Sequence, residues 1–177
     1  MSTVPLPPSA SPTSVAGVFA PDAVAASLAL QLRDARPGDL PALLGLEAQF
    51  PGDRTSDALF RALIASPRAT VRVAELDGRV VGYHVVRRRW FRRTAWLYSI
   101  AVDAGARRRG IGRRLLADAE AGARRAGARG MTLEVRADNA AAAALYARAG
   151  YRPVKRLRAY YDDGTDGWRH RRDFATP

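Results

Sequence analysis

A basic, glycine-rich stretch follows an apolar, β-branched run near the middle of the chain. Its residues are Arg107, Arg108, Arg109, Gly110, Ile111, Gly112 and Arg113, and helical spacing begins within it. A loop between a strand and a helix start can bind a diphosphate, because glycines let the backbone approach, successive N–H groups point at the anion and the helix dipole favours negative charge. This stretch therefore predicts capture of a phosphorylated cofactor.

Two common phosphate-binding loops do not match this stretch. It has no Gly-Lys-Ser/Thr step for a nucleoside triphosphate and its magnesium, and no Gly-x-Gly-x-x-Gly, because Arg113, Arg114 and Leu115 follow Gly112. The pattern present is Arg107-x-x-Gly110-x-Gly112. With it the chain resembles the GCN5-related N-acetyltransferase (GNAT) superfamily, whose Gln/Arg-x-x-Gly-x-Gly/Ala signature holds the pyrophosphate of acetyl-coenzyme A.

A second motif of the same superfamily follows the first. Residues 133–139 read Leu-Glu-Val-Arg-Ala-Asp-Asn, and residues 145–151 read Leu-Tyr-Ala-Arg-Ala-Gly-Tyr. These segments look most like those of bacterial enzymes that acetylate the N-terminal alanine of a ribosomal protein. The chain departs from those enzymes at Leu59 and Phe60, where a tryptophan is common, and this leaves the identity of the acceptor open.

The resemblance implies roles for particular positions. In such enzymes the glutamate of the second motif is the general base and the tyrosine twelve positions later is the general acid. A coenzyme-contacting asparagine follows the glutamate, and a Tyr-Tyr pair near the end lies beside the acceptor. The matching residues here are Glu134, Tyr146, Asn139, Tyr160 and Tyr161.

These residue types suit the acetylation of an amine. A protonated amine attacks a thioester only after a base such as Glu134 removes a proton, directly or through water, and Tyr146 can protonate the departing thiolate. Backbone N–H groups of Ile100, Ala101 and Val102 can polarise the thioester carbonyl if the strand bulges or splays there. The sequence has no cysteine, in keeping with direct transfer in a ternary complex.

Each assignment has a structural alternative. Glu134 could be a partly buried carboxylate paired with an arginine such as Arg136, and Tyr146 could simply pack against its neighbours. Residues 107–109 could form an ordinary solvated turn. The remaining candidates are expected to be a strand histidine without catalytic duty and turn-forming aspartates that could also attract a cationic amine: His84, Asp162, Asp163 and Asp166.

The chain is strongly basic. Its formal net charge is +12, and of 29 basic residues only Lys155 is a lysine. This bias favours compositional drift toward arginine and alanine, with a basic cofactor groove as a further cause, and makes nucleic acid an unlikely partner. Residues 87–93 mix arginines with two aromatic rings; we expect a hairpin loop there rather than a surface that stacks single-stranded nucleic acid.

Composition also bounds the cellular setting. No apolar run approaches the length of a membrane span, and residues 1–30 lack the basic start of a secretory signal. We therefore expect a cytoplasmic protein with no membrane partner, as a monomer or a homodimer. With no cysteine and two histidines, no metal centre is expected.

The sequence divides into a tail and one domain. Residues 1–28 are rich in serine, proline and alanine and are expected to be disordered, whereas residues 29–177 form the acetyltransferase domain. Strands are predicted at 28–33, 70–75, 79–87, 94–103, 131–136, 151–161 and 168–174, and helices at 40–48, 55–65, 110–126 and 139–149. Asp39 is expected to cap the first helix, and Asp77-Gly78 is expected to form the turn of a hairpin between the strands at 70–75 and 79–87. The resemblance implies an α/β fold of GNAT type, with a mixed, mostly antiparallel twisted sheet that is splayed between its central strands and flanked by helices.

The sequence thus predicts an acetyl-CoA-dependent N-acetyltransferase that moves the acetyl group directly to a primary amine. The favoured acceptor is a protein or peptide N-terminal α-amine. The alternatives are a small-amine acetyltransferase acting on a polyamine, an amino acid or an aminoglycoside, a non-catalytic acetyl-CoA sensor, and a nucleic-acid-binding module.

Overall fold

The computed structural model describes residues 30–50, 55–88 and 93–175. The predicted tail at 1–28 and the middle of the basic-aromatic stretch, residues 89–92, lie outside the described residues. No helix in the described ranges is both long enough and apolar enough to cross a membrane.

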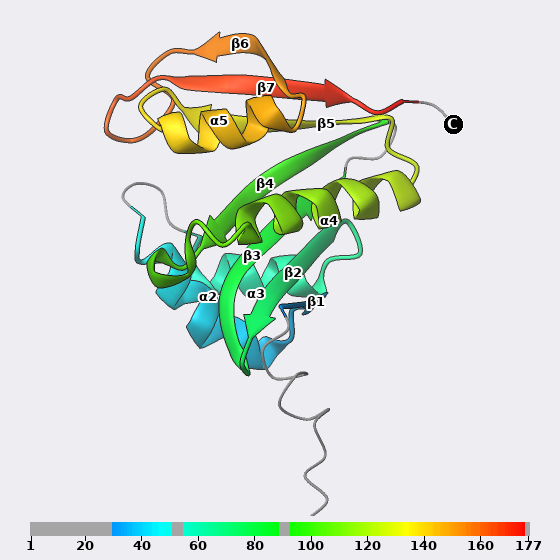
Figure 1. Ribbon diagram of the computed structural model, residues 1–177, viewed down its shortest axis with the longest axis vertical. Helices are drawn as coiled ribbons and strands as arrows, with labels where there is room; N and C mark the ends of the chain where they lie inside the picture. The colour runs from blue at the N-terminus through cyan, green and yellow to red at the C-terminus, as the bar shows by residue number, and fades with distance from the viewer. Residues whose placement is uncertain (1–29, 51–54, 89–92, 176–177) are drawn as a thin grey trace, which may run out of the picture.

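A seven-stranded sheet in the order β1-β2-β3-β4-β5-β7-β6 forms the centre of the molecule (Figure 1). Every neighbouring pair is antiparallel except β4 and β5, which run parallel. The strands are β1 Gln31–Asp34, β2 Ala69–Leu76, β3 Arg79–Arg87, β4 Thr94–Val102, β5 Gly130–Arg136, β6 Arg152–Leu157 and β7 Gly167–Asp173. The helices are α2 Leu40–Glu47, α3 Asp57–Ala65, α4 Ile111–Arg125 and α5 Ala140–Arg148, with short 3₁₀ turns η1 Pro37–Asp39 and η2 Ala104–Ala106. The predicted fold class is confirmed.

The helices cover opposite faces of the sheet. Apolar residues of α2 and α3 pack against β2 and β3 in one buried cluster, and those of α4 and α5 pack against β4 and β5 in another. Helix α4 shows the spacing that causes this, because its buried residues Ile111, Leu115, Ala119 and Ala123 recur every four positions along one stripe. The sheet is therefore packed on one face against α2 and α3 and on the other against α4 and α5.

Strand β4 changes face part-way along. It pairs with β3 at Leu97 and again at Ser99, so Tyr98 is an extra residue, a β-bulge. Ala95 and Leu97 consequently lie in the α4–α5 cluster, whereas Ala101, which strict alternation would place beside them, lies in the α2–α3 cluster. The bulge thus redirects the second half of β4.

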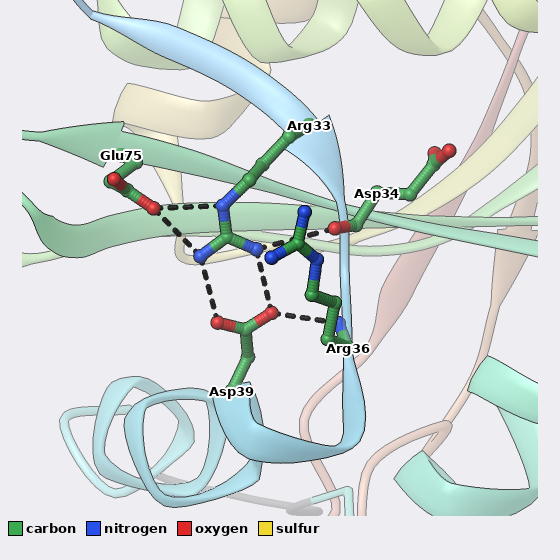
Figure 2. A network of polar contacts seen from close by, with 5 residues as sticks. All are labelled: Arg33, Asp34, Arg36, Asp39 and Glu75. Atoms are coloured by element: carbon green, nitrogen blue, oxygen red, sulfur yellow. Dashed lines mark hydrogen bonds and ion pairs between the residues drawn. The ribbon is translucent and has the colours of Figure 1, made fainter.

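Two local predictions have different outcomes. The turn between β2 and β3 is confirmed, with Asp77 and Gly78 both at positive φ (51° and 74°), as a two-residue hairpin requires. Asp39 is the N-cap residue of α2, as predicted, but its side chain makes no hydrogen bond to the first turn of that helix. Its carboxylate instead receives two 2.8 Å hydrogen bonds from Arg33, which also bonds Glu75 (Figure 2). The same carboxylate also accepts from Arg36 N at 2.7 Å, so it is bonded to β1 and to the start of η1 rather than to α2.

The predicted strand at 151–161 is too long. Strand β6 ends at Leu157, and residues 158–166 form turns that carry Tyr160 and Tyr161. The tyrosine pair therefore stands on a connection at the end of the sheet, where side chains are free to face a cleft.

Candidate active site

A cleft opens where β4 and β5 diverge. Their parallel pairing runs from Thr94 to Leu97 on β4 and stops there, so the edge of β4 from Tyr98 to Val102 has no strand beside it. The cleft has a volume of about 350 Å³ and brings together side chains from both halves of the chain. Its lining includes Glu47, Phe50, Trp96, Tyr98, Ile100, Ala101, Glu134, Arg136, Asn139, Tyr146, Tyr160 and Tyr161.

Glu134 projects from β5 into this cleft and is largely shielded from solvent, with 9% of its side chain exposed. One carboxylate oxygen accepts a hydrogen bond from the indole N–H of Trp96, and the other accepts one from Arg169 Nε at 2.7 Å. The partner expected from sequence was an arginine such as Arg136, and the partner observed is Arg169. Each oxygen keeps a lone pair that can take a proton from an amine or a water.

Tyr146 enters the cleft from α5 and is 5% exposed. Burial raises the pKa of its phenol well above the usual value, so the group keeps its proton at neutral pH and is able to donate a hydrogen bond. Its ring also packs against Tyr151, with centroids 5.9 Å apart. The packing alternative and the acid role are thus compatible in one side chain.

The predicted coenzyme contacts at residues 107–113, hereafter the coenzyme loop, form an anion cradle. Arg108 and Gly110 both have positive φ (63° and 76°), and Gly110 is the N-cap of α4. The first N–H groups of α4, beginning at Ile111, have no partner within the helix because they lie in its first turn. The α4 N-terminus, with its positive dipole and the neighbouring arginines, therefore fits a pyrophosphate.

Gly112 lies where α4, α5 and β4 approach one another. A Cβ atom there would lie 3.6 Å from Leu145 Cδ2 and 3.8 Å from Val102 Cγ2, so the site tolerates little more than a small side chain. Arg107 reaches back over the ring of Phe50, 5.2 Å from its centroid, and donates to the Val102 carbonyl at 3.3 Å. These contacts join the coenzyme loop to the cleft.

Four more residues predicted to contact the coenzyme lie along the open edge of β4 or close to it. Ile100 and Ala101 line the cleft, and Val102 ends the strand beside the coenzyme loop. Asn139 caps α5, since its Oδ1 accepts from Ala142 N at 3.0 Å, which leaves its amide Nδ2 for a ligand. The unpaired β4 edge offers backbone N–H groups of the kind that polarise a carbonyl.

Glu47 is a cleft residue that sequence reasoning missed. It ends α2 and is 9% exposed, and its two oxygens accept hydrogen bonds from the Tyr83 hydroxyl and from Thr55 N. Burial and this carboxylate together raise the pKa of Tyr83 far above its usual range, so the phenol stays a donor. No local motif marks Glu47, because its partners lie 8 and 36 residues away.

Comparison with known proteins decides the family. A model of the acetyltransferase (GNAT) family matches residues 40–151. The chain belongs to this family. It is 40% identical over 139 residues to the N-alpha-acetyltransferase RimI of Mycobacterium tuberculosis, covering 75% of this chain and 85% of that one. It is 33% identical over 149 residues to an N-alpha-acetyltransferase of Sulfurisphaera tokodaii, covering 78% and 89%.

A solved structure agrees with these relatives. The ribosomal-protein-S18-alanine N-acetyltransferase of Escherichia coli superposes with a TM-score of 0.75 at 27% identity, covering 84% of this chain and 96% of that one. GNAT enzymes use acetyl-CoA as the acetyl donor, which supplies an activated thioester at the cleft. The chain is therefore an acetyl-CoA-dependent N-acetyltransferase, and the cradle at α4 fits the coenzyme's pyrophosphate.

Proposed function

We propose that this GNAT enzyme acetylates the α-amino group of protein N-termini. One observation carries the proposal: a carboxylate, Glu134, and a protonated phenol, Tyr146, line the same cleft beside the unpaired edge of β4. The names of the relatives support an N-terminal acceptor, since two are N-alpha-acetyltransferases and one acts on ribosomal protein S18.

Glu134 takes one proton from the acceptor ammonium, directly or through one water, and the neutral amine attacks the thioester carbon. As the C–S bond breaks, Tyr146 donates its proton to the departing thiolate, and the second amine proton passes through water to the phenolate that remains. Backbone N–H groups on β4 near Ile100 and Ala101 hold the thioester oxygen, and the coenzyme loop with Asn139 holds the remainder of the coenzyme. Tyr160 and Tyr161 bind the acceptor chain at the mouth of the cleft.

The test measures coenzyme A release, by free thiol, from acetyl-CoA with three acceptors: an unblocked peptide, the same peptide with an acetylated N-terminus, and a polyamine. We expect turnover only with the unblocked peptide, and a fall in kcat of about 100-fold or more in Tyr146→Phe, the usual size of an acid–base contribution. Tyr151→Phe is the matched control, because Tyr151 packs beside Tyr146 and is equally buried.

Two outcomes contradict the proposal. Turnover of the polyamine alone assigns the enzyme to small amines. Tight acetyl-CoA binding without turnover of any acceptor assigns it to coenzyme sensing.

A further inference from the structure

Arg136 is the most heavily bonded side chain at the acceptor end of the cleft. It ends β5 and lines the cleft, with 18% of its side chain exposed. Its Nη2 donates to Asp163 at 2.8 Å and to Thr165 Oγ1 at 2.9 Å, and its Nε and Nη2 each donate to Asp138 at 3.1 Å. Its guanidinium also lies over the ring of Tyr161, 4.9 Å from the centroid. One side chain therefore joins β5 to the turn that carries the tyrosine pair.

That turn is closed by its own backbone. The N–H groups of Tyr160 and Tyr161 both donate to the Thr165 carbonyl, at 3.1 and 3.2 Å, and Gly164 N donates to the Tyr161 carbonyl at 2.8 Å. The Asp163 carboxylate accepts from Thr165 N at 3.0 Å. Arg136 bonds both Asp163 and Thr165, and Thr165 in turn bonds the backbone of both tyrosines. Arg136 therefore helps to fix the position of the two tyrosines.

The side chains of Tyr160 and Tyr161 pack against the backbone of Gly167. This glycine is the residue opposite Arg136 in the β5–β7 register. A Cβ atom on Gly167 would lie 3.2 Å from Tyr160 Cδ1 and 3.4 Å from Tyr161 Cε2, so both rings pack onto bare backbone. Both rings therefore contact Gly167, and the Tyr161 ring also contacts the Arg136 guanidinium.

The charges around Arg136 suit a cationic acceptor. An unpaired guanidinium in the cleft would repel an ammonium group, but Arg136 is paired with the carboxylates of both Asp138 and Asp163. The three charges sum to −1. This cluster attracts a protonated amine while it fixes the turn.

We propose that Arg136 is a positioning residue for the acceptor: it holds the 160–165 turn so that Tyr161 closes the acceptor end of the cleft. The inference rests on the proposed function, because it assumes that the acceptor enters beside the tyrosine pair. The coenzyme loop, which leads into α4, makes none of these contacts. Loss of Arg136 therefore weakens acceptor binding selectively.

The test separates acceptor KM, kcat and the acetyl-CoA Kd in Arg136→Gln, Arg136→Lys and Asp163→Asn. We expect Arg136→Gln to raise the acceptor KM about tenfold, as for the loss of charge-assisted contacts worth about 1.4 kcal/mol, with a change in kcat below about threefold. The acetyl-CoA Kd stays at the wild-type value. Arg136→Lys keeps the positive charge but loses the planar guanidinium, so its acceptor KM should lie between those of wild type and Arg136→Gln.

A double-mutant cycle tests the route through the turn. Arg136→Gln combined with Asp163→Asn raises KM no further than Arg136→Gln alone, because both changes break the same link. Arg61→Gln is the matched control. Arg61 forms an exposed arginine–aspartate pair with Asp57 on α3, at 2.6 Å and away from the cleft, and its loss leaves both constants unchanged.

An unchanged acceptor KM in Arg136→Gln overturns the inference. So does a parallel loss of kcat, acetyl-CoA affinity and thermal stability, which is the pattern of a residue that only supports the fold. The proposed function is tested separately by wild type in the same assay. If wild type acetylates a polyamine and no peptide, that function fails, and the KM of each variant for the polyamine still decides the role of Arg136.

Discussion

The coenzyme loop and the acceptor side of the cleft are built on different principles. The coenzyme loop is one contiguous segment, and its geometry comes from backbone: two residues at positive φ and the free N–H groups of a helix start. The acceptor side is assembled from side chains of α2, β4, β5 and the 158–166 turn, and Glu47, Glu134 and Arg136 among them are held by side-chain hydrogen bonds. Binding of a coenzyme by backbone groups depends little on which side chains are present. A cleft wall made of side chains, in contrast, can be changed by substitution to suit a different acceptor.

The largest change in kcat is expected on substitution of Glu134, the general base of the proposed mechanism. Glu134→Gln keeps the contact with Trp96 but cannot take a proton, so kcat with an unblocked peptide falls about 100-fold. Arg169→Gln removes the guanidinium from the other oxygen and is expected to lower kcat less than tenfold. Equal losses in the two variants would reduce Glu134 to a structural partner of Arg169.

Substitution of Glu47 is expected to change both the free energy of unfolding and the acceptor KM. In Glu47→Gln the carbonyl oxygen can accept from Thr55 N, and the amide N–H then faces the Tyr83 hydroxyl, which turns to donate to Ser99 Oγ. The variant loses two hydrogen bonds to a charged acceptor, and a bond of that kind contributes about 1.5–3 kcal/mol. We expect urea unfolding to show a loss of about 2 kcal/mol and the acceptor KM to rise, while the acetyl-CoA Kd holds. An increase in the acetyl-CoA Kd alone would contradict the separation of the two regions.

The coenzyme loop should respond to backbone change without loss of acceptor affinity. Gly110→Ala places a Cβ on a residue at φ 76°, a strain of about 1–2 kcal/mol, so we expect the acetyl-CoA Kd to rise about tenfold by calorimetry. Gly45→Ala is the matched control in α2, where an added Cβ meets nothing within 4 Å. It should stabilise the fold by about 1 kcal/mol and leave the acetyl-CoA Kd unchanged.

The smallest effect concerns His170, which lies under the cleft beside Tyr146 with ring centroids 6.5 Å apart. Burial lowers the pKa of His170 below its ordinary value, so the unfolded chain binds this proton more readily than the folded one. Its contribution to stability is complete above the ordinary pKa of 6.5 and is lost as the pH falls through the lower folded value.

Thermal unfolding at pH 7.5 and pH 5.5 measures this contribution. The fall in melting temperature between the two pH values should be smaller in His170→Gln than in wild type. An identical fall in both proteins would show that other groups account for the pH dependence.

The sequence by itself determined the features that depend on neighbouring residues. Positive φ at Asp77, Gly78 and Gly110, the apolar stripe of α4 and the cap at Asn139 are consequences of local backbone chemistry, and they fix the order of elements and the coenzyme loop. The two motifs placed Glu134 and Tyr146, which the fold brings into one cleft. Their catalytic roles, and the domain boundary after residue 28, stay predictions.

Tertiary structure alone decided which side chains became partners. Strand β7 inserts between β5 and β6, so Arg169 comes directly opposite Glu134, and Arg136, two residues along β5, is left for Asp163. The same is true of the bulge at Tyr98 and of Glu47, whose contacts depend on strands and helices far away in the chain. Pairing across a sheet depends on strand order and register, and the sequence around one residue contains neither.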